Sequence, residues 1–147
     1  MFSQTAEYAL RAVVCLADGD PRPRTAQDLA ARTQVPRDYL SKVMQALGRA
    51  NIVRAQRGKN GGFSLARPPK ELTIFDVVDC VDPVPRIDRC PLGLRAHQGT
   101  LCPLHRRLDA AMQKIEQEFK QASIAQLLRP GAGVKPLCEI AEVSLAS

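Results

Sequence analysis

The chain has 147 residues, which is the size of one domain or of one domain with an appendage. Hydrophobic residues make up 45% of it and aromatic residues only 4%. The hydrophobic share argues against a disordered chain, and the low aromatic share favours packed helices rich in Leu, Val, Ile and Ala. The net charge of +6 lies in the first half, because residues 1–67 hold 11 basic and 5 acidic side chains and residues 68–147 hold 10 of each. A basic module joined to a neutral one is typical of a phosphate-binding half and a self-association half, although a generic basic surface has the same charge.

The first residues contain no basic segment leading into an apolar run, and no uncharged apolar stretch approaches the roughly 20 residues of a membrane span. We therefore expect a cytoplasmic protein with no membrane partner. In a reducing compartment, spaced cysteines favour metal, cluster or redox chemistry over structural disulfides. The chain has five: Cys15, Cys80, Cys90, Cys102 and Cys138.

The sequence predicts three helices in the first 50 residues, of which the second and third are short. Apolar residues at helical spacing predict a first helix that is capped by Ser3 and ends near Gly19. Thr25 and Asp28 resemble a capping pair at the start of a second helix. After a brief turn, Pro36 suits the first turn of a third helix.

The third helix has two distinct faces. One apolar stripe contains Leu40, Val43, Met44 and Leu47. The opposite, polar face contains Arg37, Asp38, Ser41, Lys42, Gln45 and Arg49. Two short helices joined by a tight turn, the second with a polar outward face, form a helix–turn–helix pattern, which many helical hairpins share.

A β-hairpin follows directly. Residues 52–56 and 63–66 are predicted strands, and residues 57–62 form a turn in which Asn-Gly is a strong hairpin signal. Ordinary turn chemistry explains the glycines, but Arg57 and Lys59 at the tip favour a wing that reaches a minor groove or flanking phosphates.

The second half is predicted to contain a short helix, a loop and a long helix. Thr73 and Asp76 cap the short helix, and the loop is long enough for a function or a bound ion to be suspected. The long helix runs from Cys102-Pro103 to about Ala122. It has an apolar seam at steps of four and three, which consists of Leu104, Leu108, Met112, Ile115, Phe119 and Ala122. Such a seam needs a partner surface, which a two-fold homodimer provides; packing on the chain's own first module is the alternative, and one helix can do both.

The expected fold class is mainly α with a small β-hairpin, a winged helix–turn–helix followed by a long C-terminal dimerisation helix. We divide the chain into a DNA-binding winged helix–turn–helix (1–82), a cysteine-containing sensor loop (83–101), a dimerisation helix with a short following helix (102–129) and a flexible tail (130–147).

These features resemble a known family, the bacterial winged-helix regulators typified by the iron–sulfur regulator IscR and the nitric-oxide sensor NsrR (the Rrf family). The resemblance covers about residues 1–129. It rests on residues 3–11 (SQTAEYALR), 35–40 (VPRDYL), 57–63 (RGKNGGF) and 74–78 (IFDVV).

The resemblance implies a homodimer that regulates transcription from a double-stranded DNA operator, with recognition helices in major grooves and wings at minor grooves. The candidate DNA contacts are Arg37, Asp38, Tyr39, Ser41, Lys42, Gln45, Arg54, Arg57 and Lys59. Arg to guanine and Lys to phosphate are expected pairings. Asp38 either accepts from a cytosine amino group or caps the helix, and Tyr39 is either a phosphate contact or a packing residue.

The resemblance also implies a two-iron–two-sulfur cluster bound by loop cysteines, sensing redox, iron–sulfur or nitric-oxide status. Cys90, Cys102 and His105 match the family's outer two cysteines and its histidine. The middle cysteine is missing, since Ala96 stands in that region with His97 beside it. His97, or Glu7 from the other subunit, would supply the fourth ligand.

Other chemistry remains open at this centre. Cys90, His97, Cys102 and His105 could bind zinc, although their spacing fits no standard finger; the two cysteines could form a reversible disulfide; or the loop could carry no chemistry. Cys15 and Cys80 are expected in the core, and Cys138 is expected to be incidental.

Two further function classes are alternatives to DNA binding. An enzyme is not expected, because the sequence has no phosphate loop, paired-carboxylate motif or nucleophile elbow. A protein-interaction module of the same fold that has lost DNA binding is the other alternative, and the basic first half argues against it.

Overall fold

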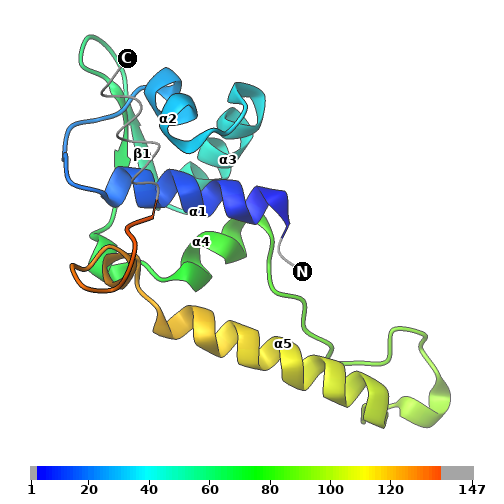
Figure 1. The fold of residues 1–147 in the computed structure, drawn as a ribbon. Coiled ribbons are helices and arrows are strands. Elements are labelled where there is room, and N and C mark those ends of the chain that lie inside the picture. The colour runs from blue at the N-terminus through cyan, green and yellow to red at the C-terminus, as the bar shows by residue number, and fades with distance from the viewer. Residues whose placement is uncertain (1–2, 137–147) are drawn as a thin grey trace.

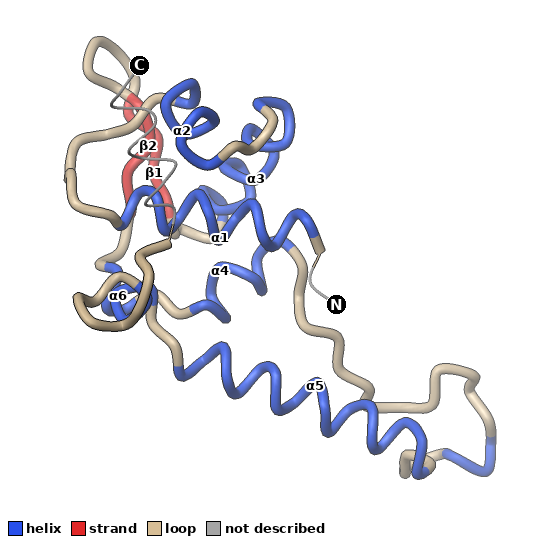
Figure 2. Tube along the Cα trace, viewed as in Figure 1, coloured by secondary structure: helices blue, strands red, loops and turns tan. Residues whose placement is uncertain are grey.

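The computed structural model describes residues 3–136, which form a helical body with one β-hairpin and a long helix along its edge (Figure 1). In chain order the elements are α1 (Gln4–Ala17), α2 (Ala26–Thr33), α3 (Arg37–Arg49), β1 (Val53–Gln56), β2 (Gly62–Leu65), the 3-10 helix η1 (Pro69–Glu71), α4 (Ile74–Val81), the 3-10 helix η2 (Arg95–His97), α5 (Pro103–Gln121) and α6 (Ile124–Leu127). Helices and the single two-stranded sheet are distinguished by colour in Figure 2. The predicted class, mainly α with a small hairpin, is confirmed.

The predicted helix caps are mostly present. Ser3 Oγ accepts a hydrogen bond from the Ala6 backbone N–H at 3.1 Å, and Thr73 forms a complete capping box with Asp76. The predicted Thr25–Asp28 pair is only half formed. Thr25 Oγ1 accepts from the Asp28 N–H at 3.1 Å, but the Asp28 carboxylate binds two arginines instead of returning to the Thr25 N–H.

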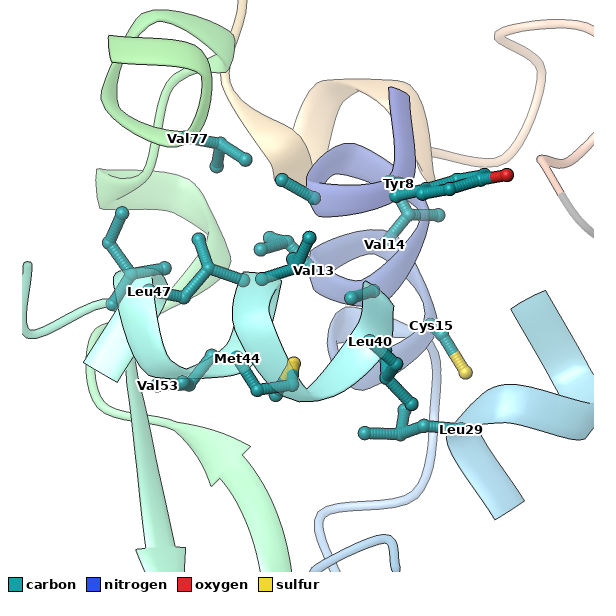
Figure 3. Packing of buried hydrophobic residues seen from close by; sticks show 14 of the residues in the cluster. Tyr8, Val13, Val14, Cys15, Leu29, Leu40, Met44, Leu47, Val53 and Val77 are labelled. Carbon is teal, nitrogen blue, oxygen red and sulfur yellow. The ribbon is translucent and has the colours of Figure 1, made fainter. Parts of the chain in front are cut away.

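The core is built around α1, which packs against α2, α3 and α4 (Figure 3). The apolar stripe predicted on α3 supplies four of its buried side chains: Leu40, Val43, Met44 and Leu47. Full burial of a leucine stabilises the fold by about 1.5–3 kcal/mol. The turn between α2 and α3 passes through Gln34, whose φ of 56° ends α2 in the left-handed region. This packing fixes which face of α3 remains in solvent.

The hairpin is joined to the helices by a short third segment. β1 and β2 pair antiparallel with Ala55 opposite Phe63. Arg24, just before α2, pairs with the other edge of β2, since its N–H donates to Phe63 O at 2.9 Å and its carbonyl accepts from the Phe63 N–H at 2.7 Å. Gly62 has a φ of 143° and no room for a Cβ against the Arg24 backbone, so only glycine suits this position.

The long helix α5 is attached to the body at its carboxyl end. The segment after α5 pairs with the segment before α4, because Ile74 N–H donates to Ala122 O at 3.0 Å and Ile124 N–H donates to Leu72 O at 2.8 Å. Ile124 is fully buried. The other end of α5 projects away from the body together with the 83–101 loop (Figure 1).

Lys135 Nζ lies 2.7 Å from Asp18 Oδ1, so the start of the predicted tail contacts the residue that ends α1. Cys138 and the rest of the predicted tail lie outside the described residues. None of the helices in residues 3–136 combines the length and the apolar character that crossing a bilayer requires.

Candidate nucleic-acid interface and cysteine loop

The outward face of α3 and the hairpin present all nine candidate DNA contacts to solvent. The exposed side chains are those of Arg37, Asp38, Tyr39, Ser41, Lys42, Gln45, Arg54, Arg57 and Lys59. Five of these are cationic and one is anionic at neutral pH. A surface of this charge, on a helix whose opposite face is buried, can approach a polyanion without disturbing the core.

The amino-terminal half of α3 and the hairpin border one cleft. A hollow of about 420 Å³ is lined by Arg37, Asp38 and Ser41 from α3 and by Phe63 from β2. Arg54 reaches across the hairpin, with its Nε donating to Ser64 Oγ at 3.4 Å. The helix–turn–helix and the hairpin therefore form one continuous surface rather than two separate ones.

One ion pair fastens the hairpin side of this surface to α2, and a second ion pair within α2 shares the same carboxylate. Arg24 Nη1 lies 3.1 Å from Asp28 Oδ2, and Arg32 Nε lies 2.9 Å from Asp28 Oδ1. Both guanidinium groups are largely buried, with 13% and 22% of their side chains exposed. Because the Arg24 backbone also pairs with β2, Asp28 holds the hairpin in place relative to the helices. The spacing of Thr25 and Asp28 predicted a capping pair and gave no sign of this role.

The expectation that Asp38 caps its helix is wrong. The capping residue of α3 is Pro36, and no side chain makes a cap hydrogen bond there. Asp38 lies in the first turn of α3, where the helix dipole favours a carboxylate, and its side chain is exposed.

Tyr39 has the packing role considered for it, and its side chain is still partly exposed. Its ring packs edge-on against Tyr8 of α1, with ring centroids 5.8 Å apart, while 49% of the residue remains exposed. Lys42 Nζ lies 5.8 Å from the centroid of the same ring. Tyr39 is thus held by packing and still accessible to a ligand.

The cysteine loop brings Cys90 and His97 together. Hydrogen bonds from the Leu94 backbone and from the His97 side chain lower the pKa of the Cys90 thiol to about 7. A thiol with that pKa is substantially ionised at neutral pH, and the thiolate is the form that binds metals and reacts with oxidants. His97 Nδ1 is buried and has no hydrogen-bond partner among the described residues.

A second Cys–His pair lies at the start of α5. Cys102 is the capping residue of that helix, and its Sγ lies 3.3 Å from His105 Nδ1. The two residues are three apart and face one another at the helix amino terminus, as their spacing predicted.

The single chain does not assemble the predicted ligand set. In residues 3–136, no group of three or more Cys, His, Asp or Glu side chains is placed to hold a metal ion. Glu7, the candidate fourth ligand, is instead paired with Arg11, whose Nε lies 3.1 Å from Glu7 Oε1. The donor atoms therefore suit a metal centre chemically, but within one chain they lie as two separate pairs.

Two of the remaining cysteines lie where core residues were expected. Cys15 is buried in α1, and burial raises the pKa of its thiol. Cys80 on α4 is half-buried against the core; burial raises the pKa of its thiol, and Sγ donates to Val77 O at 3.2 Å. Raised pKa values keep both thiols protonated and unreactive.

Comparison with known proteins decides the family. A family model described as Rrf2, iron-dependent transcriptional regulator, matches residues 2–130. The chain belongs to the Rrf2 family. A relative from Aquifex aeolicus, described as an HTH-type transcriptional regulator, is 30% identical over 131 residues, covering 87% of this chain and 91% of the relative. Another, from Mycobacterium tuberculosis and described in the same way, is 35% identical over 128 residues, covering 84% of this chain and 80% of the relative.

Solved structures share the fold of this Rrf2-family chain. T. potens IscR superposes with a TM-score of 0.72 at 21% identity, covering 87% of this chain and 85% of that one. CymR, the global cysteine regulator of B. subtilis, superposes with a TM-score of 0.68 at 19% identity, covering 86% and 95%. The winged helix–turn–helix predicted from the sequence is confirmed. The chain is a DNA-binding transcriptional regulator, and its relatives are regulators rather than enzymes.

Proposed function

We propose that this regulator binds its operator as a homodimer, with α3 in the major groove and the hairpin at the flanking minor groove or phosphates. The observation that supports this most strongly is the continuous exposed surface of α3 and the hairpin, which carries all nine candidate contacts. Cations on this surface would neutralise phosphates, while Arg37 and Gln45 have the donor groups that read base edges.

The face of α5 supports the homodimer. None of its residues is buried in the single chain, and three seam residues are largely exposed: Leu104 (63%), Leu108 (44%) and Ile115 (39%). Met112 and Phe119 of the same seam, together with Ile115, line a groove of about 510 Å³ with Val84 and Pro85. Pairing with a second α5 would remove this stripe of apolar side chains, which runs along a helix of 19 residues, from water.

The dimer predicts a footprint that can be tested. Two recognition helices related by a two-fold axis reach half-sites about 10 base pairs apart, or a multiple of that spacing. Hydroxyl-radical footprinting on a duplex selected from a random-sequence library should show two protected segments with that spacing. A single protected segment would contradict the dimer, and the absence of any selected duplex would contradict DNA recognition.

We further propose that the sensor consists of Cys90 in the 83–101 loop and Cys102 directly after it. Each cysteine lies beside a histidine, and Cys90 has a lowered pKa, so both are suited to metal binding or oxidation. A two-iron–two-sulfur cluster held by Cys90, Cys102 and His105 would supply redox chemistry, with His97 or the other subunit's copy of Glu7 as fourth ligand. That arrangement requires the two Cys–His pairs to come together, which a dimer or a change in the loop would have to provide.

An absorption spectrum and iron and sulfide analysis of protein purified without oxygen separate the forms of this sensor. Visible bands with about two irons and two sulfides per chain would support the cluster. Colourless protein with bound zinc would support the zinc site. Metal-free protein whose two cysteines oxidise reversibly would support a thiol switch, and unchanged operator affinity of the Cys90→Ala/Cys102→Ala variant in reduced, oxidised and nitric-oxide-treated samples would contradict any sensor.

A further inference from the structure

A series of contacts connects the first turns of α1 with the polar face of α3. Arg11, paired with Glu7, has its guanidinium carbon 5.5 Å from the centroid of the Tyr8 ring. The Tyr8 and Tyr39 rings meet edge to face, with centroids 5.8 Å apart and planes at 70°. Lys42 Nζ lies 5.8 Å from the Tyr39 centroid. We call Glu7, Arg11, Tyr8, Tyr39 and Lys42 the α1–α3 stack.

The two α1 residues Tyr8 and Arg11 are held more firmly than the two α3 residues Tyr39 and Lys42. Tyr8 is 8% exposed and belongs to the core, whereas Tyr39 is 49% exposed. Arg11 is held from two sides, because its Nη1 also donates to the carbonyl of Thr33 at 3.3 Å. Thr33 is the last residue of α2, so Arg11 connects α1 with the turn of the helix–turn–helix. Lys42 has no ion-pair partner in the part of the chain described here, and the Tyr39 ring is the group that its ammonium faces.

We propose that Arg11 and Tyr8 are positioning residues for DNA binding, which act by fixing Tyr39 and, through its ring, the Lys42 ammonium. This inference rests on the proposed function, in which the polar face of α3 contacts the operator. A lysine side chain has four rotatable bonds, and ordering it on DNA costs conformational entropy. A ring that already holds the ammonium near its bound position reduces that cost.

The expected size of the effect follows from the contacts. Edge-to-face aromatic pairs and partly exposed cation–π contacts are each modest, so loss of Arg11 should weaken operator binding by about three- to tenfold. Removal of Lys42 should weaken it by a similar or greater factor, since a phosphate contact is lost as well. A purely structural role for Arg11 would instead lower thermal stability and weaken DNA binding equally whether or not Lys42 is present.

A double-mutant cycle on the full chain distinguishes these roles. Operator affinity is measured for the wild-type protein, Arg11→Met, Lys42→Gln and the double variant, with circular dichroism to confirm that each is folded. None of the hydrogen bonds, ion pairs or ring contacts of the described residues joins Arg11 to Lys42, so the two tyrosines are the route by which contacts would couple them. We expect Arg11→Met to cost three- to tenfold in the wild-type background and less than about twofold in Lys42→Gln.

Three controls make the result specific. Lys70→Met removes the same charge from an exposed position in η1 and should change affinity by less than twofold in both backgrounds. Tyr8→Phe keeps the ring and should bind as the wild type does, whereas Tyr8→Leu should behave like Arg11→Met.

Equal losses from Arg11→Met in both backgrounds would overturn the stack as a positioning device while leaving DNA binding intact. Failure of the wild-type protein to bind any duplex would overturn the proposed function instead.

Discussion

Arg86, near the start of the 83–101 loop, donates two parallel hydrogen bonds to Asp109 of α5: Nε to Oδ1 at 2.7 Å and Nη2 to Oδ2 at 3.0 Å. The backbone N–H of Ile87 donates to Asp109 Oδ1 at 2.9 Å, and Arg86 Nη1 also lies 3.4 Å from Glu116 Oε2. Bidentate arginine–carboxylate pairs have a defined geometry as well as a favourable charge. The loop that carries Cys90 is therefore tied to the helix that carries Cys102 at a defined point.

Removing this tie should release the loop. Asp109→Asn is expected to speed chymotryptic cleavage after Leu92 and Leu94, which are already 76% and 46% exposed, without lowering the helical content of the protein. Glu118→Gln, another exposed carboxylate of α5 removed without loss of an ion pair in the described structure, serves as the matched control. Equal cleavage rates for Asp109→Asn and the wild type would show that the pair does not restrain the loop.

The same pair has a defined pH dependence. Hydrogen bonds from Arg86 and then from the Ile87 N–H lower the pKa of Asp109 to about 2. A depressed folded-state pKa means that the contribution to stability is fully present above the unfolded value of about 3.9 and is lost as the pH falls towards 2. A carbon-13 titration of the Asp109 carboxyl group should give a midpoint near 2 in the wild type and a higher one in Arg86→Met. Identical midpoints in the two proteins would contradict the pairing.

The exposed stripe of α5 predicts the effect of charge at the dimer interface. Leu108→Glu and Ile115→Glu should each shift the protein from dimer to monomer in sedimentation experiments, because a carboxylate would be buried against apolar side chains. Gln113→Glu adds the same charge on the opposite side of the helix and should leave the dimer intact. If only Gln113→Glu dissociated the dimer, the interface would lie on the opposite face of α5 from the one proposed here.

Two glycines should respond in opposite directions to alanine. Gly62→Ala should destabilise the hairpin, since φ is 143° and the added Cβ would meet the Arg24 backbone. Gly48→Ala lies inside α3 with open space around the new Cβ and should stabilise the protein by about 0.5–1 kcal/mol. Urea unfolding measures both. A neutral Gly62→Ala would show that the close approach of Arg24 to β2 is not needed.

Local patterns predicted the elements well. The i, i+3, i+4, i+7 spacing of Leu40 and Leu47 places the buried face of α3 correctly, and Asn60-Gly61 predicts the hairpin turn. The features that sequence reasoning missed depend on contacts between distant segments. Arg24 pairs with Phe63 across 39 positions and Arg86 with Asp109 across 23, and no periodicity reports such contacts.

The same limit applies to the ligand set of the sensor loop. The i, i+3 spacing of Cys102 and His105 on one helix start predicted that they would meet, and they do. Whether Cys90 joins them depends on the path of an irregular loop, which spacing does not determine. In the single chain the path brings Cys90 to His97 instead.

The salt dependence of DNA affinity is the sharpest test of whether α3 and the hairpin bind the phosphate backbone and bases of an operator. Fluorescence anisotropy on a selected duplex, from low to moderate salt, should show log affinity falling linearly with log salt. Lys42→Gln and Arg57→Gln should each reduce the magnitude of the slope by about one, whereas Lys70→Met should leave it unchanged. An affinity that is independent of salt, or a slope that is the same in all four proteins, would contradict the account.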